Sequence, residues 1–118
     1  QVLEKFEAGM ALIGQEVKAI KTGKMNLSGS YVVLREGQAH LVGSHIPAYQ
    51  PKNAPQDYNP ERSRKLLLKK TEIKHLIGKT RQKGLTLLPI RVYAKNGKLK
   101  LEFGLARGLK KADKREAI

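Results

Sequence analysis

Hydrophobic residues along this chain fall into short runs separated by glycine, proline and charged residues. Residues 10–13 form an apolar run that ends at Gly14, which predicts a short buried strand. In residues 15–22 the apolar and basic positions fall on separate faces of a helix. We therefore expect an amphipathic helix there, with Gly14 as its N-cap and Gly23 as a left-handed residue after its end.

Two β-hairpins are predicted from turn dipeptides between β-rich runs. Glu36-Gly37 divides residues 31–42 into two strands, and the expected pairs are Arg35 with Gln38, Leu34 with Ala39, and Val32 with Leu41. Asn96-Gly97 is the stronger signal because a type I′ turn needs positive φ at both central residues. Its register predicts the inward pairs Ala94–Leu99, Val92–Leu101, Ile90–Phe103 and Leu88–Leu105.

The same register predicts the outward pairs of the second hairpin, which are Tyr93 with Lys100 and Arg91 with Glu102. Pro89 falls opposite Gly104. Because proline cannot donate a hydrogen bond to a ladder, we expect a bulge or a sheet edge at this position.

The middle of the chain combines a loop, a strand and a helix. Residues 47–60 hold four of the five prolines, which predicts a loop without strand or helix. Residues 65–69 fit either a strand or the front of a helix, and we favour the strand. Ile73, Leu76, Ile77 and Thr80 share one face of a helix that begins near Thr71 and ends at Gly84.

These elements predict a mainly β (α+β) fold. About six antiparallel strands with two to three peripheral helices close most naturally as a small barrel of the oligonucleotide-binding (OB) type over residues 1–108. Residues 109–118 are basic and contain few apolar residues, so we expect them to begin a flexible basic tail.

Positive charge is concentrated in the second half of the chain. The 118 residues carry 24 Lys and Arg against 10 Asp and Glu, a net charge of +14. Residues 1–59 have 6 basic against 5 acidic residues, whereas residues 60–118 have 18 against 5. Such an excess favours a polyanionic partner. We favour nucleic acid over a membrane surface, because the sequence contains no basic amphipathic helix with bulky aromatic residues on its other face.

Other functional classes find little support in the sequence. There is no cysteine, which removes disulfides and thiolate metal sites and fits a reducing compartment, and no apolar run is long enough to span a membrane. Gly78-Lys79-Thr80 resembles the end of a phosphate-binding loop, but Ile73 stands where that motif needs its first glycine. No nucleophile can be paired with a base, and we expect neither an enzyme nor a cofactor.

The histidines, one acidic residue and the tyrosines leave alternatives open. His40, His45 and His75 lack the spacing of metal ligands, so we expect no metal site. Glu7, which we place just ahead of the first strand, is either a solvated charge or a carboxylate that holds a lysine at a binding surface. The tyrosines, which could stack on bases or pack in the barrel, are Tyr31, Tyr49, Tyr58 and Tyr93.

Several ordered motifs across the whole chain resemble the small protein B family, the bacterial partner of transfer-messenger RNA (tmRNA), also called the SsrA-binding protein family. The motifs are Phe6-Glu7-Ala8-Gly9, Gly14-Gln15-Glu16-Val17-Lys18, Gly23-Lys24-Met25-Asn26-Leu27, Ser30-Tyr31, residues 60–68, Gly84-Leu85-Thr86, Lys95-Asn96-Gly97, Gly104-Leu105-Ala106-Arg107-Gly108 and Asp113-Lys114-Arg115.

The resemblance implies an OB-type barrel that grips the elbow of the tRNA-like domain of tmRNA. It implies a cytoplasmic, monomeric, non-catalytic bacterial protein that delivers this RNA to stalled ribosomes for trans-translation and reaches the decoding centre. Elongation factor Tu and alanyl-tRNA synthetase would be partners through the RNA, and no membrane would be involved. The alternative is a structural protein that binds ribosomal RNA.

The resemblance also assigns residues to two surfaces. Those expected at the RNA are Glu7, Asn26, Arg62, Arg64, Lys65, Leu67, Lys69, Lys95, Asn96 and Lys100. Those expected to serve the ribosome are Gly108, Lys110, Lys111, Asp113, Lys114 and Arg115. Ala112 departs from many relatives, which have an aromatic residue or histidine there, and some relatives have another polar residue in place of Lys69.

Overall fold

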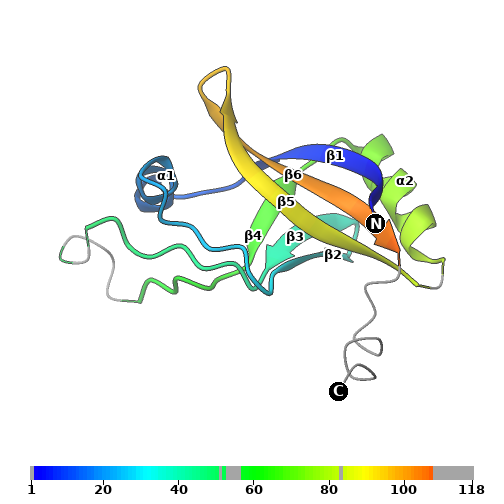
Figure 1. Cartoon of the computed structure of the whole chain (residues 1–118), viewed down its shortest axis with the longest axis horizontal. Helices are drawn as coiled ribbons and strands as arrows, with labels where there is room; N and C mark the ends of the chain where they lie inside the picture. Colours follow the sequence, from blue (N-terminus) through cyan, green and yellow to red (C-terminus); the bar gives the residue numbers. More distant parts are fainter. Residues whose placement is uncertain (1, 51, 53–56, 83, 108–118) are drawn as a thin grey trace.

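The strands close into a barrel, as expected from the sequence (Figure 1). The computed structural model describes residues 2–50, 52, 57–82 and 84–107. In this part of the chain six antiparallel strands follow the order β1-β4-β3-β2-β5-β6 around the barrel. They are β1 (Val2–Met10), β2 (Tyr31–Arg35), β3 (Gln38–Val42), β4 (Arg64–Leu67), β5 (Leu85–Lys95) and β6 (Lys98–Arg107).

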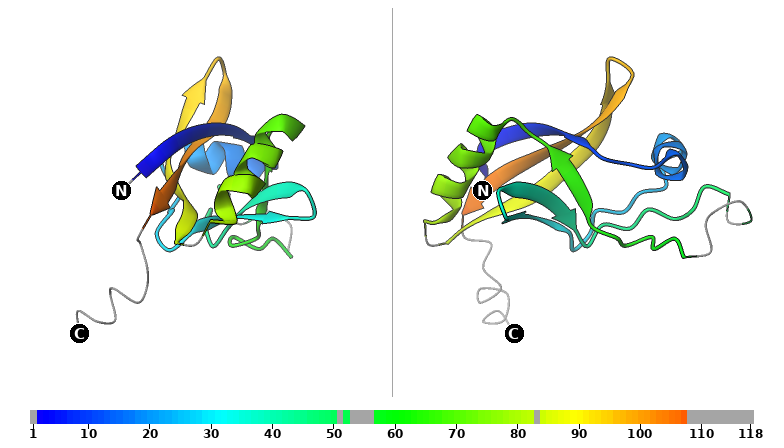
Figure 2. Two further views of the ribbon diagram at one scale, coloured as in Figure 1. Left: turned by 90° about the vertical axis from the view of Figure 1, so that its right-hand side faces the viewer. Right: turned by 180° about the vertical axis from the view of Figure 1, so that it is seen from behind.

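Two helices, α1 (Gly14–Lys21) and α2 (Lys70–Thr80), lie toward opposite ends of the molecule (Figures 1 and 2). Helix α2 covers part of the barrel and buries Leu76 in the core. At its start, the Lys69 N–H donates to Glu72 Oε1 at 2.8 Å, which satisfies one of the free backbone donors of the first turn. The two helices therefore lie at different ends of the molecule, with the strands between them.

The core consists of side chains that point inward from every strand. Phe103 of β6 is completely buried, and Phe6 of β1 stacks on it with ring centroids 5.5 Å apart. Leu41, Leu66 and Leu87, from β3, β4 and β5, are also buried. The alternation of buried and exposed residues is clear in β4, where it places Lys65 and Leu67 on the outer face of the barrel.

The start of the chain corrects two predictions. Strand β1 covers residues 2–10, and residues 11–13, expected to complete a strand, have no regular structure. The N-cap of α1 is Ile13 rather than Gly14, because Glu16 in the first turn accepts a hydrogen bond from the Ile13 N–H at 3.1 Å. Gly23 has φ of +78°, which confirms the left-handed residue after this helix.

Both hairpins are confirmed, and the second differs from its predicted register beyond a bulge. The three expected β2–β3 pairs occur. In β5–β6 the pairs from the turn to Arg91–Glu102 are also as expected. An extra residue, Ile90, then shifts the pairing, so that Pro89 faces Phe103 and Leu87 faces Leu105. The predicted pairs Ile90–Phe103, Leu88–Leu105 and Pro89–Gly104 are therefore wrong, because the extra residue shifts the register beyond it, whereas the bulge expected near Pro89 is confirmed. Ala94, expected to face inward, is exposed.

In the middle of the chain, the strand prediction for residues 65–69 is confirmed for its first part. Strand β4 ends at Leu67, and α2 begins at Lys70 and ends at Thr80, a full turn before Gly84. Helix α2 runs through Gly78 without interruption. In the described part of residues 47–60 there is no strand or α-helix. Residues 108–118 lie outside the described residues, so the division into barrel and tail stays a prediction.

Candidate nucleic-acid interface

An open groove of about 490 Å³ lies on the outer surface where β1, β4 and β6 meet the start of α2. We call it the central groove. Five of the residues that the sequence analysis assigned to RNA binding line it: Glu7, Lys65, Leu67, Lys69 and Lys100. They come from three separate segments of the chain, and the closure of the barrel brings them together. The remaining lining residues are Gly9, Gln38, Leu66, Leu68, Glu72 and Ile73.

Leu67 is an exposed apolar residue beside the lysines of the groove, with 53% of its area exposed. The alternation of β4 turns Arg64 and Leu66 inward and Lys65 and Leu67 outward. Gly9 pairs with Leu67 across the β1–β4 ladder, and a Cβ atom at Gly9 would lie 3.4 Å from Leu67 Cδ1. The missing side chain at Gly9 therefore leaves Leu67 free to present its apolar surface in the groove.

Glu7 lies within β1 rather than ahead of it, which corrects the predicted position. Its Oε1 accepts a hydrogen bond from Lys95 Nζ at 3.3 Å, so the carboxylate lines the groove and holds a lysine that lies outside the lining. Interaction with the Tyr93 hydroxyl, together with Lys95 and Lys100, lowers the pKa of Glu7 despite its partial burial. Glu7 is therefore a carboxylate at neutral pH.

Tyr93 is held from two sides on the outer face of β5. Its interaction with the Glu7 carboxylate raises the pKa of Tyr93 to about 12, so that the hydroxyl remains protonated. Arg91 Cζ lies 4.6 Å from the centre of the Tyr93 ring, and the Arg91 Nε donates to Glu102 Oε1 at 2.7 Å. Tyr93 therefore interacts with the Glu7 carboxylate through its hydroxyl and has one ring face covered by the Arg91 guanidinium.

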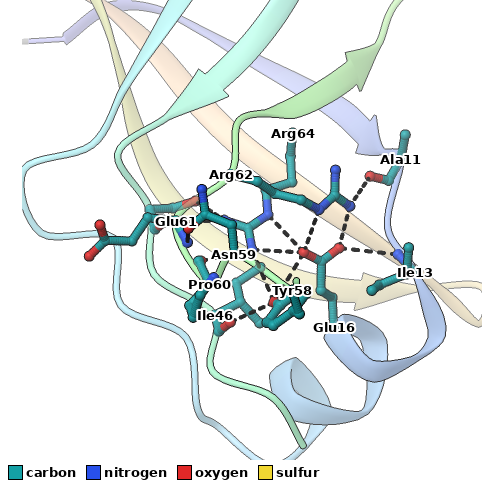
Figure 3. Close-up of polar contacts among 11 residues, drawn as sticks. Ala11, Ile13, Glu16, Ile46, Tyr58, Asn59, Pro60, Glu61, Arg62 and Arg64 are labelled. Carbon is teal, nitrogen blue, oxygen red and sulfur yellow. Dashed lines mark hydrogen bonds and ion pairs between the residues drawn. The ribbon is translucent and has the colours of Figure 1, made fainter. Parts of the chain in front are cut away.

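Arg62 and Arg64 belong to a buried network with Glu16, shown in Figure 3. Arg64 is completely buried, and its Nη2 donates to Glu16 Oε2 at 2.7 Å and to the Pro60 carbonyl at 2.9 Å. The Arg62 Nε donates to the same carboxylate oxygen at 2.9 Å. The Tyr58 hydroxyl donates to the Ile46 carbonyl at 2.6 Å, close to the carboxylate.

This network explains why the buried side chain of Glu16 stays ionised. Burial alone would raise the pKa of Glu16, but hydrogen bonds from Arg62, Arg64 and the Ile13 N–H outweigh it and lower the pKa. The network ties α1 to β4 and to the segment before it. Arg64 is therefore buried away from any RNA, which corrects its predicted place on the contact surface. Arg62 pairs with Glu16 but keeps 34% of its side chain exposed, so its contact with RNA stays a prediction.

The structure places Asn26, Lys95 and Asn96 outside the lining of the central groove. Asn26 forms a β-bridge with His45, and its Oδ1 accepts a hydrogen bond from the Ser28 N–H at 2.8 Å. Asn96 has φ of +53° in the β5–β6 turn. Lys95 precedes that turn and reaches the groove only through Glu7. The expected ribosome residues, which are Gly108, Lys110, Lys111, Asp113, Lys114 and Arg115, lie outside the described residues.

Among the described residues, no three His, Cys, Asp or Glu side chains are grouped to hold a metal ion. His75 pairs with Glu4 at 3.1 Å and His45 with Glu61 at 3.5 Å, each between partly exposed side chains. None of the described helices has the length and apolar character to cross a membrane. The groups that the central groove offers to a ligand are lysine side chains, the carboxylates of Glu7 and Glu72, and an exposed leucine.

Glu16 is the residue that sequence reasoning missed. In an amphipathic helix of eight residues, a glutamate followed by Val17 and Lys18 is typical of the solvent face. Only the presence of Arg62 and Arg64, two residues apart and more than forty positions later, could have suggested a buried partner. The β-strand alternation of Arg64 with the apolar Leu66 was the available signal, because it places Arg64 on the inward face.

Comparison with known proteins shows the family that this chain is similar to. The family model described as SmpB protein matches residues 1–118. SsrA-binding proteins from Thermosynechococcus vestitus and Sulfurihydrogenibium sp. are 47% and 50% identical to this chain, cover 100% and 99% of it, and are themselves covered over 78% and 76% of their lengths. A chain in the solved structure described as "tmRNA-SmpB: a journey to the center of the bacterial ribosome" matches with a TM-score of 0.75. It is 41% identical, and the match covers 99% of this chain and 85% of that one. The chain therefore belongs to the SmpB protein family.

Proposed function

We propose that this protein binds the tRNA-like domain of tmRNA through the central groove and accompanies it to stalled ribosomes. The observation that carries the proposal is the meeting of Lys65, Lys69 and Lys100 around the exposed Leu67. Lysines neutralise phosphates and give affinity without sequence preference, whereas an exposed leucine can contact an unstacked base or a ribose. The relatives named SsrA-binding protein support this choice of RNA.

The groove favours a folded RNA over an unstructured strand. Single-stranded RNA is usually bound by a series of exposed aromatic side chains, and aromatics make up only 5% of this chain. Two of the four tyrosines, Tyr58 and Tyr93, are engaged in contacts within the protein. Recognition by shape and phosphate position suits an RNA whose own fold presents its backbone in a fixed arrangement, such as a tRNA-like elbow.

The protein has no catalytic role in this proposal. It places the RNA on the ribosome, where translation resumes on the reading frame that the RNA itself carries. Its site of action is then the bacterial cytoplasm, where ribosomes work. Elongation factor Tu and alanyl-tRNA synthetase act on the same RNA and meet this protein through it. We assign the ribosome-dependent step to Gly108, Lys110, Lys111, Asp113, Lys114 and Arg115.

The test compares binding of the tRNA-like domain with binding of a plain RNA duplex of the same length at one salt concentration. We expect preference for the tRNA-like domain and a linear fall of log K with log salt. Lys69→Glu and Lys100→Glu should each weaken binding about tenfold and reduce the salt slope by about 1. Equal affinity for the two RNAs would refute the proposal.

Two controls separate the barrel from the tail. Lys18 is exposed on α1 and does not line the groove, so Lys18→Glu should leave RNA affinity within about twofold of the original. Lys114→Glu should leave RNA binding unchanged and reduce tagging of incomplete proteins in a reconstituted translation reaction. If Lys114→Glu and Lys100→Glu had the same effect on RNA binding, the division between barrel and tail would be wrong.

A further inference from the structure

A second recess of about 330 Å³ lies beside the central groove. It is bounded by the end of β1, helix α1 and the β5–β6 turn, and α1 and this turn lie toward the same end of β1 (Figures 1 and 2). We call it the apolar bay, because its walls are formed by Met10, Leu12, Val17, Leu67 and Leu99. Gly9, Leu67 and Lys100 line both the bay and the central groove, so the two recesses are adjacent.

The mouth of the bay is basic. Lys21 at the end of α1 and Lys98 and Lys100 at the start of β6 are its charged lining residues. No carboxylate lines the bay in the described part of the chain, in contrast to the central groove, where Glu7 and Glu72 contribute. An occupant must therefore combine an uncharged body with negative charge close beside it.

We propose that the apolar bay holds one unstacked nucleobase of the RNA that occupies the central groove. This inference rests on the proposed function and adds a contact that the groove itself does not contain. A nucleobase has two apolar faces and is attached to an anionic backbone, so it matches aliphatic walls with lysines at the mouth. Leu67, exposed where the two recesses join, lies between the base in the bay and the backbone in the groove.

Aliphatic side chains set the character of this contact. Leu12 and Leu99 are partly buried and pack against the barrel core, so the walls of the bay are anchored. They offer apolar contact without hydrogen-bond donors or acceptors. The bay therefore contacts the flat faces of a base and makes no hydrogen bond to its edges through these side chains. We therefore expect the bay to favour an unpaired position of the RNA over a paired one, with little preference for base identity.

The test is a double-mutant cycle between protein and RNA. In the tRNA-like domain, each unpaired nucleotide is replaced in turn by an abasic one, and each RNA is titrated with the original protein and with Val17→Asn. At one position the abasic change should cost the original protein about fivefold in affinity, the lower end of what one stacked base contributes, and cost the variant nothing. Val17→Asn should also leave the salt slope unchanged, since no phosphate contact is lost.

The matched control is Ile20→Asn, on the same helix. Ile20 lines a different recess, with Met25, Leu27 and Val92, so this variant should show the same abasic penalty as the original protein. Thermal melting of both variants establishes that they fold. If Val17→Asn does not fold, Leu12→Asn provides a second change in the bay. If the original protein prefers the tRNA-like domain but no abasic position is coupled to Val17→Asn, the proposal that the bay holds a nucleobase is wrong and the proposed function still stands. If the original protein shows no preference for the tRNA-like domain over a plain duplex, the proposed function itself is wrong.

Discussion

The buried carboxylate of Glu16 is the interaction on which the orientation of α1 depends, and Glu16→Gln tests it. Glutamine keeps the size of the side chain and an oxygen that can accept from the Ile13 N–H, so the change removes mainly the charge. It leaves the Arg64 guanidinium completely buried with only neutral partners, including Ser44 and Pro60. Breaking a buried ion pair from one side costs about 3–5 kcal/mol of unfolding free energy.

We expect a loss of about 3 kcal/mol, at the lower end of this range, because Arg62 is 34% exposed and regains hydration when the carboxylate charge is removed. For a domain of this size that corresponds to a fall in melting temperature of roughly 15 °C. Urea unfolding followed by circular dichroism measures the loss. Arg62→Gln is the control and should cost about 1 kcal/mol, since the Glu16–Arg64 pair remains. A loss for Glu16→Gln no larger than for Arg62→Gln would refute this account of the network.

The same carboxylate predicts how stability depends on pH. Because the folded protein lowers the pKa of Glu16, the unfolded chain binds a proton more readily at acidic pH. The contribution of Glu16 is therefore fully present above the ordinary glutamate pKa of about 4.3 and is lost as pH falls through the lower folded value. The original protein should lose stability on acidification below about pH 4, and Glu16→Gln should lose less. Equal acid sensitivity of the two proteins would count against this prediction.

Three further predictions concern single residues. Glu7→Gln should bring the pKa of Tyr93 from about 12 back toward 10, seen as an earlier phenolate step in an absorbance titration, whereas an unchanged titration would exclude the Glu7 interaction as its cause. Gly97→Ala should lower stability by about 1 kcal/mol in urea unfolding, because φ at Gly97 is +78°. Gly78→Ala should raise stability by about 0.5 to 1 kcal/mol in the same assay, since Gly78 lies within α2 and nothing stands within 4 Å of the added carbon; a loss there would show that the helix needs glycine.

Sequence patterns predicted the barrel well where local chemistry determines the backbone. The Asn96-Gly97 turn requires positive φ, and this requirement alone fixed the pairing out to Arg91 with Glu102. Beyond that point the pattern could not reveal that Ile90 is the extra residue of a bulge, because apolar residues run continuously through residues 87–90. A continuous apolar run fits either register.

The interface was less accessible to sequence reasoning, for reasons that Arg64 and Leu67 illustrate. A basic residue beside other basic residues is typical of an exposed surface, and although the alternation of β4 places Arg64 on the inward face, the position of Glu16 in space is what supplies its buried partner. Leu67 belongs to an apolar triplet, and the strand alternation of β4 is what separates it from the buried Leu66. Composition indicated the partner, but closure of the barrel decides which residues can reach it.

Closure of the barrel also means that the first strand, β1, depends on the last strand, β6, for most of its hydrogen-bonded pairing. Strand β1 pairs with β6 from Val2 to Gly9 and with β4 only at Gly9 and Met10. During synthesis, the hydrogen-bonding edge of β1 therefore stays open until residues 98–107 have left the ribosome, and an open edge is a template for aggregation. A copy of this protein that is released before that point lacks the partner strand of β1 and cannot close its barrel. Synthesis of this protein must therefore run through β6 before the protein can act on stalled ribosomes.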